Sequence, residues 1–317
     1  MRKSLHSIFT TLGAGAILCA FWSVAPAAEG QKVFALVPKL VGVPFYADVE
    51  KGCMEEAKKI NAKCLFIGPA QADEAEQVKF IRDLITKSVD GISIAPNNPE
   101  SVASVIKAAQ DKGIPVITFD SDAPKTSRTT FVGTNNFEGG VEGGKAFQAA
   151  LPHGGKYAVI IGGLAADNLN ARIKGFKSAL GGSFTEIAGS PFPCDDDSNK
   201  AVQLIQDILA KNSDIDGIFF SGGWPMFAPE AYSRALNKRH DDLKSGKFVI
   251  VSFDTLDVQL KLLKSGLATT LIGQRPYKMG TGSIQTLAKL SSKESAPGVI
   301  DTGVDVVDSK NVDSFQK

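Results

Sequence analysis

The chain contains 317 residues, of which 43% are hydrophobic, and its 35 lysines and arginines are opposed by 34 aspartates and glutamates. This length is sufficient for about two domains with substantial cores. The balanced charge, without a basic stripe, argues against nucleic acid as the main partner.

The N-terminus has the three parts of an export signal. Arg2 and Lys3 precede an uncharged apolar run from Ile8 to Val24, and Ala25-Pro26-Ala27 supplies a small-x-small cleavage pattern. We therefore predict that residues 1–27 are a signal peptide that is removed after Ala27. The alternative is an uncleaved membrane anchor, because the apolar run is just long enough to cross a bilayer.

Beyond this segment, short apolar runs alternate with longer segments of helical periodicity. In the periodic segments apolar residues recur every three to four positions, which is typical of one buried helix face. In the first half this pattern predicts strands at 33–37, 64–67, 92–95 and 116–120, and helices at 45–60, 74–87 and 99–112.

The second half repeats the same order of elements. Residues 78–94 are similar to residues 202–220, and residues 115–120 are similar to residues 249–254. A single repeat at such a long spacing indicates two similar domains rather than an array of short units. Alternation of strands and helices favours parallel sheets with right-handed crossovers, so we predict an α/β protein with two doubly wound parallel-sheet lobes. The predicted strands are 157–161, 185–189, 218–220 and 248–253, and the predicted helices are 168–180, 198–211 and 229–237.

The sequence contains no motif of a catalytic site. A GxSxG elbow, a GxxxxGKS/T loop and a plausible Cys/His pair are all absent, and the Gly-Gly pairs lack GxGxxG spacing after a strand. His153 and His240 are far apart, without CxxC or HxxxH spacing. We therefore expect that the protein is not an enzyme, and we expect neither a cofactor nor a metal site.

Polar and aromatic side chains follow most of the predicted strands. In a doubly wound sheet the ligand binds beyond the carboxyl ends of the strands. Carboxylates and amides can pair with vicinal hydroxyls, an arginine adds a planar set of donors, and aromatic rings cover the C–H faces of a sugar. The pattern therefore predicts a polyhydroxylated ligand. The candidate residues are Lys39, Phe45, Tyr46, Asn97, Asp120, Asp122, Asp167, Asn168, Arg172, Asp195, Trp224, Asp254 and Gln274.

Many of these residues also have an ordinary structural interpretation. An aspartate at a strand end is often the N-cap of the next helix, which applies to Asp120, Asp167 and Asp254. The two aromatic residues after the first strand can belong to the core, where most aromatic residues lie. Lys39 can instead be a solvated charge in a loop, and Asn97 can be present only because asparagine favours turns.

Three cysteines follow the signal segment. Cys53 is expected on the first helix and Cys64 at the start of the second strand. A helix that turns back into an adjacent strand brings such positions within disulfide reach, and the alternative is two buried thiols. Cys194 is then unpaired.

Several of these segments resemble the ribose-type periplasmic sugar-binding proteins that feed ABC importers, and the similarity extends over residues 31–317. Two departures argue against ribose itself. Val43 stands where an asparagine often contacts sugar, and Gly223-Trp224 replaces the usual Asn-Asp. The segments that carry the resemblance are Gly42–Tyr46, Pro115–Asp120, Ala171–Phe176, Ser252–Asp254 and Gln274–Gly280.

The resemblance implies the type I periplasmic binding protein fold, in which a three-segment hinge joins the lobes. The implied lobes are residues 28–133 plus 275–302 and residues 134–274 plus 303–317. The implied ligand is a monosaccharide or sugar alcohol, which a periplasmic, monomeric receptor delivers to the membrane permease of an ABC importer. The implied sugar contacts are Phe45, Tyr46, Asp120, Arg172, Asp254 and Gln274.

A second, narrower resemblance gives an alternative. Residues 37–43 are similar to the start of the autoinducer-2-binding proteins, which use a lysine at the position of Lys39 together with aspartates at later strand ends. Asp120 or Asp122, and Asp167, match that set. The lactose-repressor family shares this fold but is excluded, because the export signal stands where its helix-turn-helix lies.

Overall fold

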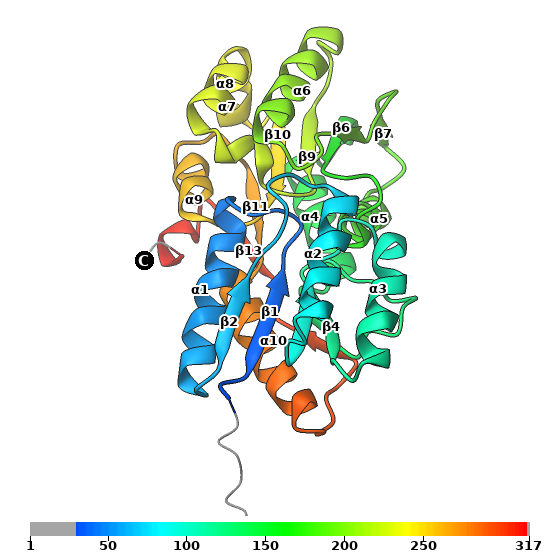
Figure 1. The fold of residues 1–317 in the computed structure, drawn as a ribbon. Coiled ribbons are helices and arrows are strands. Elements are labelled where there is room, and N and C mark those ends of the chain that lie inside the picture. Colours follow the sequence, from blue (N-terminus) through cyan, green and yellow to red (C-terminus); the bar gives the residue numbers. More distant parts are fainter. Residues whose placement is uncertain (1–29, 316–317) are drawn as a thin grey trace, which may run out of the picture. The chain divides into compact units, whose positions relative to one another are not determined.

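Two mostly parallel β-sheets surrounded by helices make up the described part of the chain (Figure 1). The structure is a computed structural model that describes residues 30–315, so the predicted signal peptide at 1–27 lies outside the described residues. Within the described part, no helix has the length and apolar character needed to cross a membrane. The predicted α/β fold class is confirmed.

The first sheet has six strands, all paired in parallel. Successive residues of β1 point to opposite faces, as in any strand. Phe34 and Leu36 therefore pack on α1 and α10, whereas Ala35 and Val37 pack on α2 and α3. Both faces are covered, which explains the nearly continuous apolar strands. In spatial order the strands are β12 (Val299–Asp301), β5 (Phe131–Gly133), β4 (Val116–Phe119), β3 (Gly91–Ile94), β1 (Val33–Val37) and β2 (Lys63–Phe66), and the helices are α1 (Pro44–Lys59), α2 (Glu74–Thr86), α3 (Pro99–Asp111) and α10 (Pro276–Ser291).

The second sheet has seven strands, and only β13 pairs antiparallel to its neighbour. Its strands are β13 (Asp305–Asp308), β11 (Thr270–Gly273), β10 (Val249–Phe253), β9 (Gly217–Phe220), β6 (Gly155–Ile161) and β7 (Phe184–Glu186), with β8 (Phe192–Pro193) also on β6. The accompanying helices are α4 (Asn136–Ala150), α5 (Asp167–Ala179), α6 (Ser198–Lys211), α7 (Pro229–Ala235), α8 (His240–Ser245) and α9 (Asp257–Lys264), with 3-10 turns at Trp224–Phe227, Asn237–Arg239 and Val312–Ser314.

The chain passes between the sheets in three places. It leaves β5 at 134–135 and enters α4, which packs on β10 and β11. It returns at 274–275 into α10, which lies among the N-terminal elements (orange in Figure 1) and packs on β3, β4 and β5. It passes back at 302–304, between β12 and β13. These short segments lie beside the ends of strands from both sheets, where a ligand site is expected.

Glycines allow two helix pairs to approach very closely. A Cβ at Gly140 of α4 would collide with the backbone of Arg172 in α5, and a Cβ at Gly175 would collide with the backbone of Phe137. The pair α1 and α10 is arranged in the same way, because a Cβ at Gly280 would meet the backbone of Val49. The Gly-Gly pairs of α4 therefore serve helix packing and fix the position of α5.

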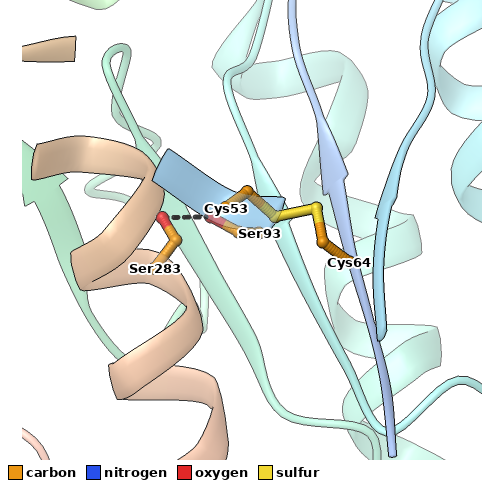
Figure 2. The surroundings of a disulfide bond; sticks show 4 residues. All are labelled: Cys53, Cys64, Ser93 and Ser283. Carbon is orange, nitrogen blue, oxygen red and sulfur yellow. Dashed lines mark hydrogen bonds between the residues drawn. A yellow bond between two sulfur atoms is a disulfide. The ribbon is translucent and has the colours of Figure 1, made fainter. Parts of the chain in front are cut away.

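The structure joins Cys53 of α1 to Cys64 of β2 in a disulfide with a Cα–Cα distance of 5.9 Å (Figure 2). On the same side of the sheet, Ser93 Oγ of β3 donates a hydrogen bond of 3.1 Å to Ser283 Oγ of α10. Among the described residues, Cys194 is a buried free thiol. The disulfide and this hydrogen bond both tie helices to the first sheet.

Several elements differ from the sequence predictions. The glycine-rich helix α4, the short helices α8 and α9, and the short strands β5, β11, β12 and β13 were not predicted. Glycine lowers helix propensity, and such short elements carry little periodicity. A strand was predicted at 185–189, whereas β7 spans Phe184–Glu186 and the chain continues into β8.

Candidate functional site

A cavity of about 50 Å³ lies at the carboxyl ends of strands from both sheets. Its walls combine charged groups, amides, aromatic rings and aliphatic side chains. The lining residues are Lys39, Leu40, Val43, Phe45, Tyr46, Asp120, Asn168, Leu169, Arg172, Asp196, Gly222, Trp224, Phe227, Asp254 and Gln274.

The first sheet contributes a lysine, an aspartate and two aromatic rings. Lys39 follows β1, and Asp120 follows β4 with a φ of 57°, in the left-handed region that non-glycine residues seldom adopt. The Tyr46 hydroxyl of α1 donates to Asp120 Oδ2 at 2.7 Å. Burial and the neighbouring Asp120 carboxylate raise the pKa of Tyr46, so this hydroxyl stays protonated and acts as a donor.

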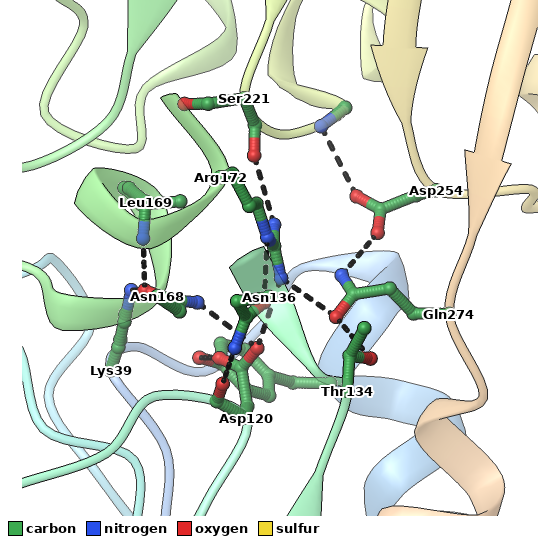
Figure 3. Close-up of polar contacts among 12 residues, drawn as sticks. Lys39, Asp120, Thr134, Asn136, Asn168, Leu169, Arg172, Ser221, Asp254 and Gln274 are labelled. Atoms are coloured by element: carbon green, nitrogen blue, oxygen red, sulfur yellow. Dashed lines mark hydrogen bonds and ion pairs between the residues drawn. The ribbon is translucent and has the colours of Figure 1, made fainter. Parts of the chain in front are cut away.

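Among the side chains that the second sheet and its helices bring to the cavity, Arg172 of α5 has the central position (Figure 3). Its guanidinium donates from Nε to Asn136 Oδ1 at 2.8 Å, from NH1 to the Ser221 carbonyl at 2.8 Å and from NH2 to Gln274 Oε1 at 2.7 Å. The ring of Phe253 lies under the guanidinium carbon at 4.1 Å. These contacts hold the side chain rigidly, and two of its five N–H donors remain for other partners.

Asp254 and Gln274 follow the neighbouring strands β10 and β11 and are bonded to each other. Gln274 Nε2 donates to Asp254 Oδ1 at 2.7 Å, and Asp254 Oδ2 accepts from the backbone N–H of Gly223 at 3.1 Å. Thr134 Oγ1, at a crossing, donates to Gln274 Oε1 at 2.9 Å. Burial raises the pKa of Asp254, and the charge of Arg172 opposes this rise. The network links the crossing segment to the cavity wall.

Direct contacts between the two sheets' side chains close the cavity. Lys39 Nζ donates to Asn168 Oδ1 at 2.8 Å, and Asn168 Nδ2 donates to Asp120 Oδ1 at 3.3 Å. Arg172 NH2 lies 3.9 Å from Asp120 Oδ1. Burial lowers the pKa of Lys39, whereas Asp196 and Asp120 raise it. Polar contacts therefore connect side chains of the two sheets across the cavity.

The structure brings most of the sequence-predicted residues to the cavity. Four lie elsewhere, and each has another partner or position; the fourth, Asp195, is described with its neighbours below. Asn97 Nδ2 donates to the Lys39 carbonyl at 2.9 Å and so supports that loop. Asp122 accepts from Thr118 and forms an ion pair with Arg128 at 2.6 Å, within the loop after β4. Asp167 is the half-buried first residue of α5 and is not a lining residue.

Sequence reasoning also missed part of the cavity wall. The candidate after β8 was Asp195, but this side chain forms an exposed ion pair with Lys200. Asp197 caps α6 by accepting from the Lys200 N–H at 2.7 Å. It is Asp196, buried and with a φ of 58°, that lines the cavity. The other lining residues outside the candidate set are Leu40, Val43, Leu169, Gly222 and Phe227, of which Val43 was noted as a position that often contacts sugar.

Comparison with known proteins establishes the family. Residues 34–295 match the family model of the periplasmic binding protein domain. The chain belongs to this family. The predicted resemblance to ribose-type periplasmic sugar-binding proteins is thereby confirmed, together with the type I fold.

Three relatives illustrate the similarity. An ABC transporter solute-binding protein from Burkholderia graminis C4D1M, solved in complex with D-arabinose, is 35% identical, with a TM-score of 0.82 over 90% of this chain and 98% of that one. Another from Agrobacterium vitis, with bound D-fucose, is 29% identical, with a TM-score of 0.79 over 89% of this chain and 97% of that one. The ribose import binding protein RbsB of Haemophilus influenzae is 26% identical over 285 residues, which cover 90% of this chain and 94% of that protein.

These relatives give no support to the autoinducer-2 alternative. Of the carboxylates that would match its ligand set, Asp122 and Asp167 do not line the cavity. Lys39 and Asp120 do line it, but their partners are Asn168 and Tyr46.

Proposed function

We propose that this periplasmic binding protein captures a monosaccharide or a sugar alcohol between its two lobes and delivers it, chemically unchanged, to the membrane permease of an ABC importer. The observation that carries the proposal is the cavity, into which the strand ends of both sheets direct hydrogen-bonding groups. The bound sugars of the structural relatives support the same ligand class.

The lining residues match the two kinds of surface that a sugar presents. Arg172 and Lys39 are donors, and Asp120 and Asp254 are acceptors, so together they suit hydroxyls that donate and accept at once. Phe45 and Trp224 belong to the same wall and provide apolar surface for C–H groups. Because these groups are already ordered by mutual hydrogen bonds, little side-chain entropy is lost when a ligand binds.

Val43 and Trp224 argue for a ligand other than ribose. Both line the cavity at positions where ribose-type proteins have polar residues. A valine offers no hydrogen bond, so a ligand hydroxyl facing it would be desolvated without a partner. We propose that the ligand turns a C–H surface toward Val43 and Trp224.

The transport role rests on a hinge at the three crossings. We propose that residues 28–133 plus 275–302 and residues 134–274 plus 303–317 move as two lobes of a monomer. A ligand that contacts both lobes binds the closed state preferentially and shifts the population toward it. Closure then presents a surface that an importer distinguishes from the open form. The family's periplasmic location and its solute-binding role support this proposal.

Calorimetry against pentoses, hexoses, deoxysugars, polyols and amino acids tests the ligand class. We expect tight binding of at least one sugar or polyol, recovered unchanged, and a smaller radius of gyration in scattering at saturation. Binding of an amino acid alone would contradict the proposal. Turnover of a bound sugar would indicate an enzyme instead.

A further inference from the structure

The carboxylate of Asp196 is buried and lines the cavity without a hydrogen-bond partner. Its residue is 6% exposed. Within residues 30–315 no donor forms a hydrogen bond or ion pair with this carboxylate. The other cavity carboxylates differ, because both oxygens of Asp120 and both oxygens of Asp254 accept hydrogen bonds. A buried charge without a donor is costly, so a carboxylate held in this wall calls for a partner.

The surrounding backbone is built to hold Asp196 in this position. Asp195 and Asp196 both have left-handed φ values, 54° and 58°, which non-glycine residues seldom adopt in succession. Gly162, at the end of β6, leaves the space that the carboxylate occupies, because a Cβ there would collide with Asp196 and with the ring of Trp224. The absence of a side chain at Gly162 thus leaves room for both the Asp196 carboxylate and the Trp224 ring in the cavity wall.

Lys39 approaches Asp196 from the other sheet. Lys39 and Asp196 line the same cavity, and apart from burial each is the strongest influence on the pKa of the other. They form no direct ion pair among the described residues. The Lys39 ammonium has three N–H donors, of which one is used by Asn168. Unused donors of Lys39 and unused acceptors of Asp196 therefore line the same cavity.

We propose that one hydroxyl of the ligand bridges Lys39 and Asp196, accepting a hydrogen bond from the ammonium and donating one to the carboxylate. This inference rests on the proposed function, since it names a group of the same ligand. A hydroxyl fits because it accepts and donates at once. The bridge joins the two lobes, and without it closure buries the Asp196 charge with no donor. The pair thus makes closure depend on a ligand that carries this hydroxyl.

Three variants test the bridge by calorimetry with D-arabinose, D-fucose, D-ribose, D-allose and D-arabinitol. Asp196→Asn tolerates the left-handed backbone and removes the charge, and Lys39→Met removes the donor. Asp195→Asn is the matched control, since this neighbour is exposed and paired with Lys200. We expect Asp196→Asn and Lys39→Met to bind the best ligand about tenfold to a hundredfold more weakly, and the control to bind within about twofold of the wild type.

Monodeoxy analogues of the best ligand identify the bridging hydroxyl. One analogue should bind the wild type at least about tenfold more weakly than its parent does. In Asp196→Asn, where Lys39 is the one charged partner left to that hydroxyl, the difference between analogue and parent should be smaller. If Asp196→Asn and Lys39→Met bind every sugar as tightly as the wild type does, the bridge is wrong although the proposed function stands. If the wild type binds no sugar or polyol, the proposed function is wrong.

Scattering of the ligand-free proteins gives a readout that needs no known ligand. Without the buried charge, Asp196→Asn should close more readily and have a smaller radius of gyration than the wild type, whereas Asp195→Asn should not. Equal radii for Asp196→Asn and the wild type would contradict the role of Asp196 in closure.

Discussion

Replacing Gly140 with alanine tests whether the close approach of α4 and α5 positions the ligand site. Gly140 lies in the middle of α4, directly against the backbone of Arg172. α5 also carries Asn168, which forms the hydrogen bond to Lys39 of the other lobe. A methyl group at position 140 therefore displaces two cavity residues without touching the cavity itself.

The structure gives the size of the effect. A Cβ at Gly140 would lie 2.8 Å from the carbonyl carbon and 2.9 Å from the Cα of Arg172. Ordinary carbon contacts are about 3.5–4.0 Å, so α5 has to retreat by roughly 1 Å. Overpacking costs about 1–3 kcal/mol, and the higher helix propensity of alanine offsets about 1 kcal/mol of it. Unfolding should therefore become easier by about 0–2 kcal/mol.

Ligand affinity should fall by more than this stability change implies. A shift of roughly 1 Å takes the Arg172 hydrogen bonds out of range, and loss of one charged hydrogen bond corresponds to about tenfold to a hundredfold in affinity. Calorimetry and thermal melting of Gly140→Ala measure both effects. Gly143→Ala is the control in the same helix, because its Cβ would meet only side chains, the nearest being Phe219 at 3.2 Å. Wild-type affinity in Gly140→Ala would refute the reasoning.

Three further predictions follow from the same contacts. In Arg172→Lys, the lysine cannot reproduce the hydrogen bonds that Arg172 donates to Asn136 and Ser221. We therefore expect ligand binding to be lost in calorimetry and the melting temperature to fall. Unchanged affinity would show that Arg172 is not a ligand contact. The double variant Cys53→Ala/Cys64→Ala should lose about 2–4 kcal/mol of stability in denaturant unfolding while keeping its sugar affinity, and an unchanged midpoint would count against the disulfide. Burial raises the pKa of Asp254 and of Asp196, which face Lys39, Arg172 and Asp120. The protonated forms of these two carboxylates therefore favour closure. This favourable contribution is complete when the pH is below their ordinary pKa of 3.8, and it is lost as the pH rises through their raised pKa values. Ligand-free protein should accordingly scatter as a more compact particle at about pH 4 than at about pH 7, and equal radii would contradict this linkage.

Much of the fold follows from patterns that a single sequence displays. The strands β1, β3, β4, β9 and β10 are buried on both faces, and their apolar runs end at turn residues, so their existence and approximate bounds were predictable. Helix α4 was not, because its glycines lower the local propensity for a helix. These glycines stabilise the fold only when α5 packs closely against them, and α5 is a separate element later in the chain.

The candidate site likewise contains residues that the sequence identifies and residues that it does not. Asp120 and Asp254 directly follow predicted strands, and the rule that ligands bind beyond the carboxyl ends of strands was sufficient to find them. Gln274 follows β11, which was not predicted, and its role as a sugar contact was implied by the family resemblance. Asn97 and Asp122 satisfy the same rule but are used by nearby groups, the Lys39 carbonyl and Arg128. Position at a strand end therefore finds candidates, and only the hydrogen-bond partners decide which of them remain available to a ligand.

The three consecutive aspartates after β8 show most clearly what sequence cannot decide. Asp195, Asp196 and Asp197 are chemically identical, yet one forms an exposed ion pair, one lines the cavity and one caps α6. Two successive left-handed residues turn these side chains in different directions, and no periodicity in the sequence encodes such a turn. What makes Asp196 a candidate ligand group is the approach of Lys39 from the other sheet. In a cleft between two lobes the decisive neighbours come from distant parts of the chain, so the pairing of charges across the cleft is a property of the folded protein.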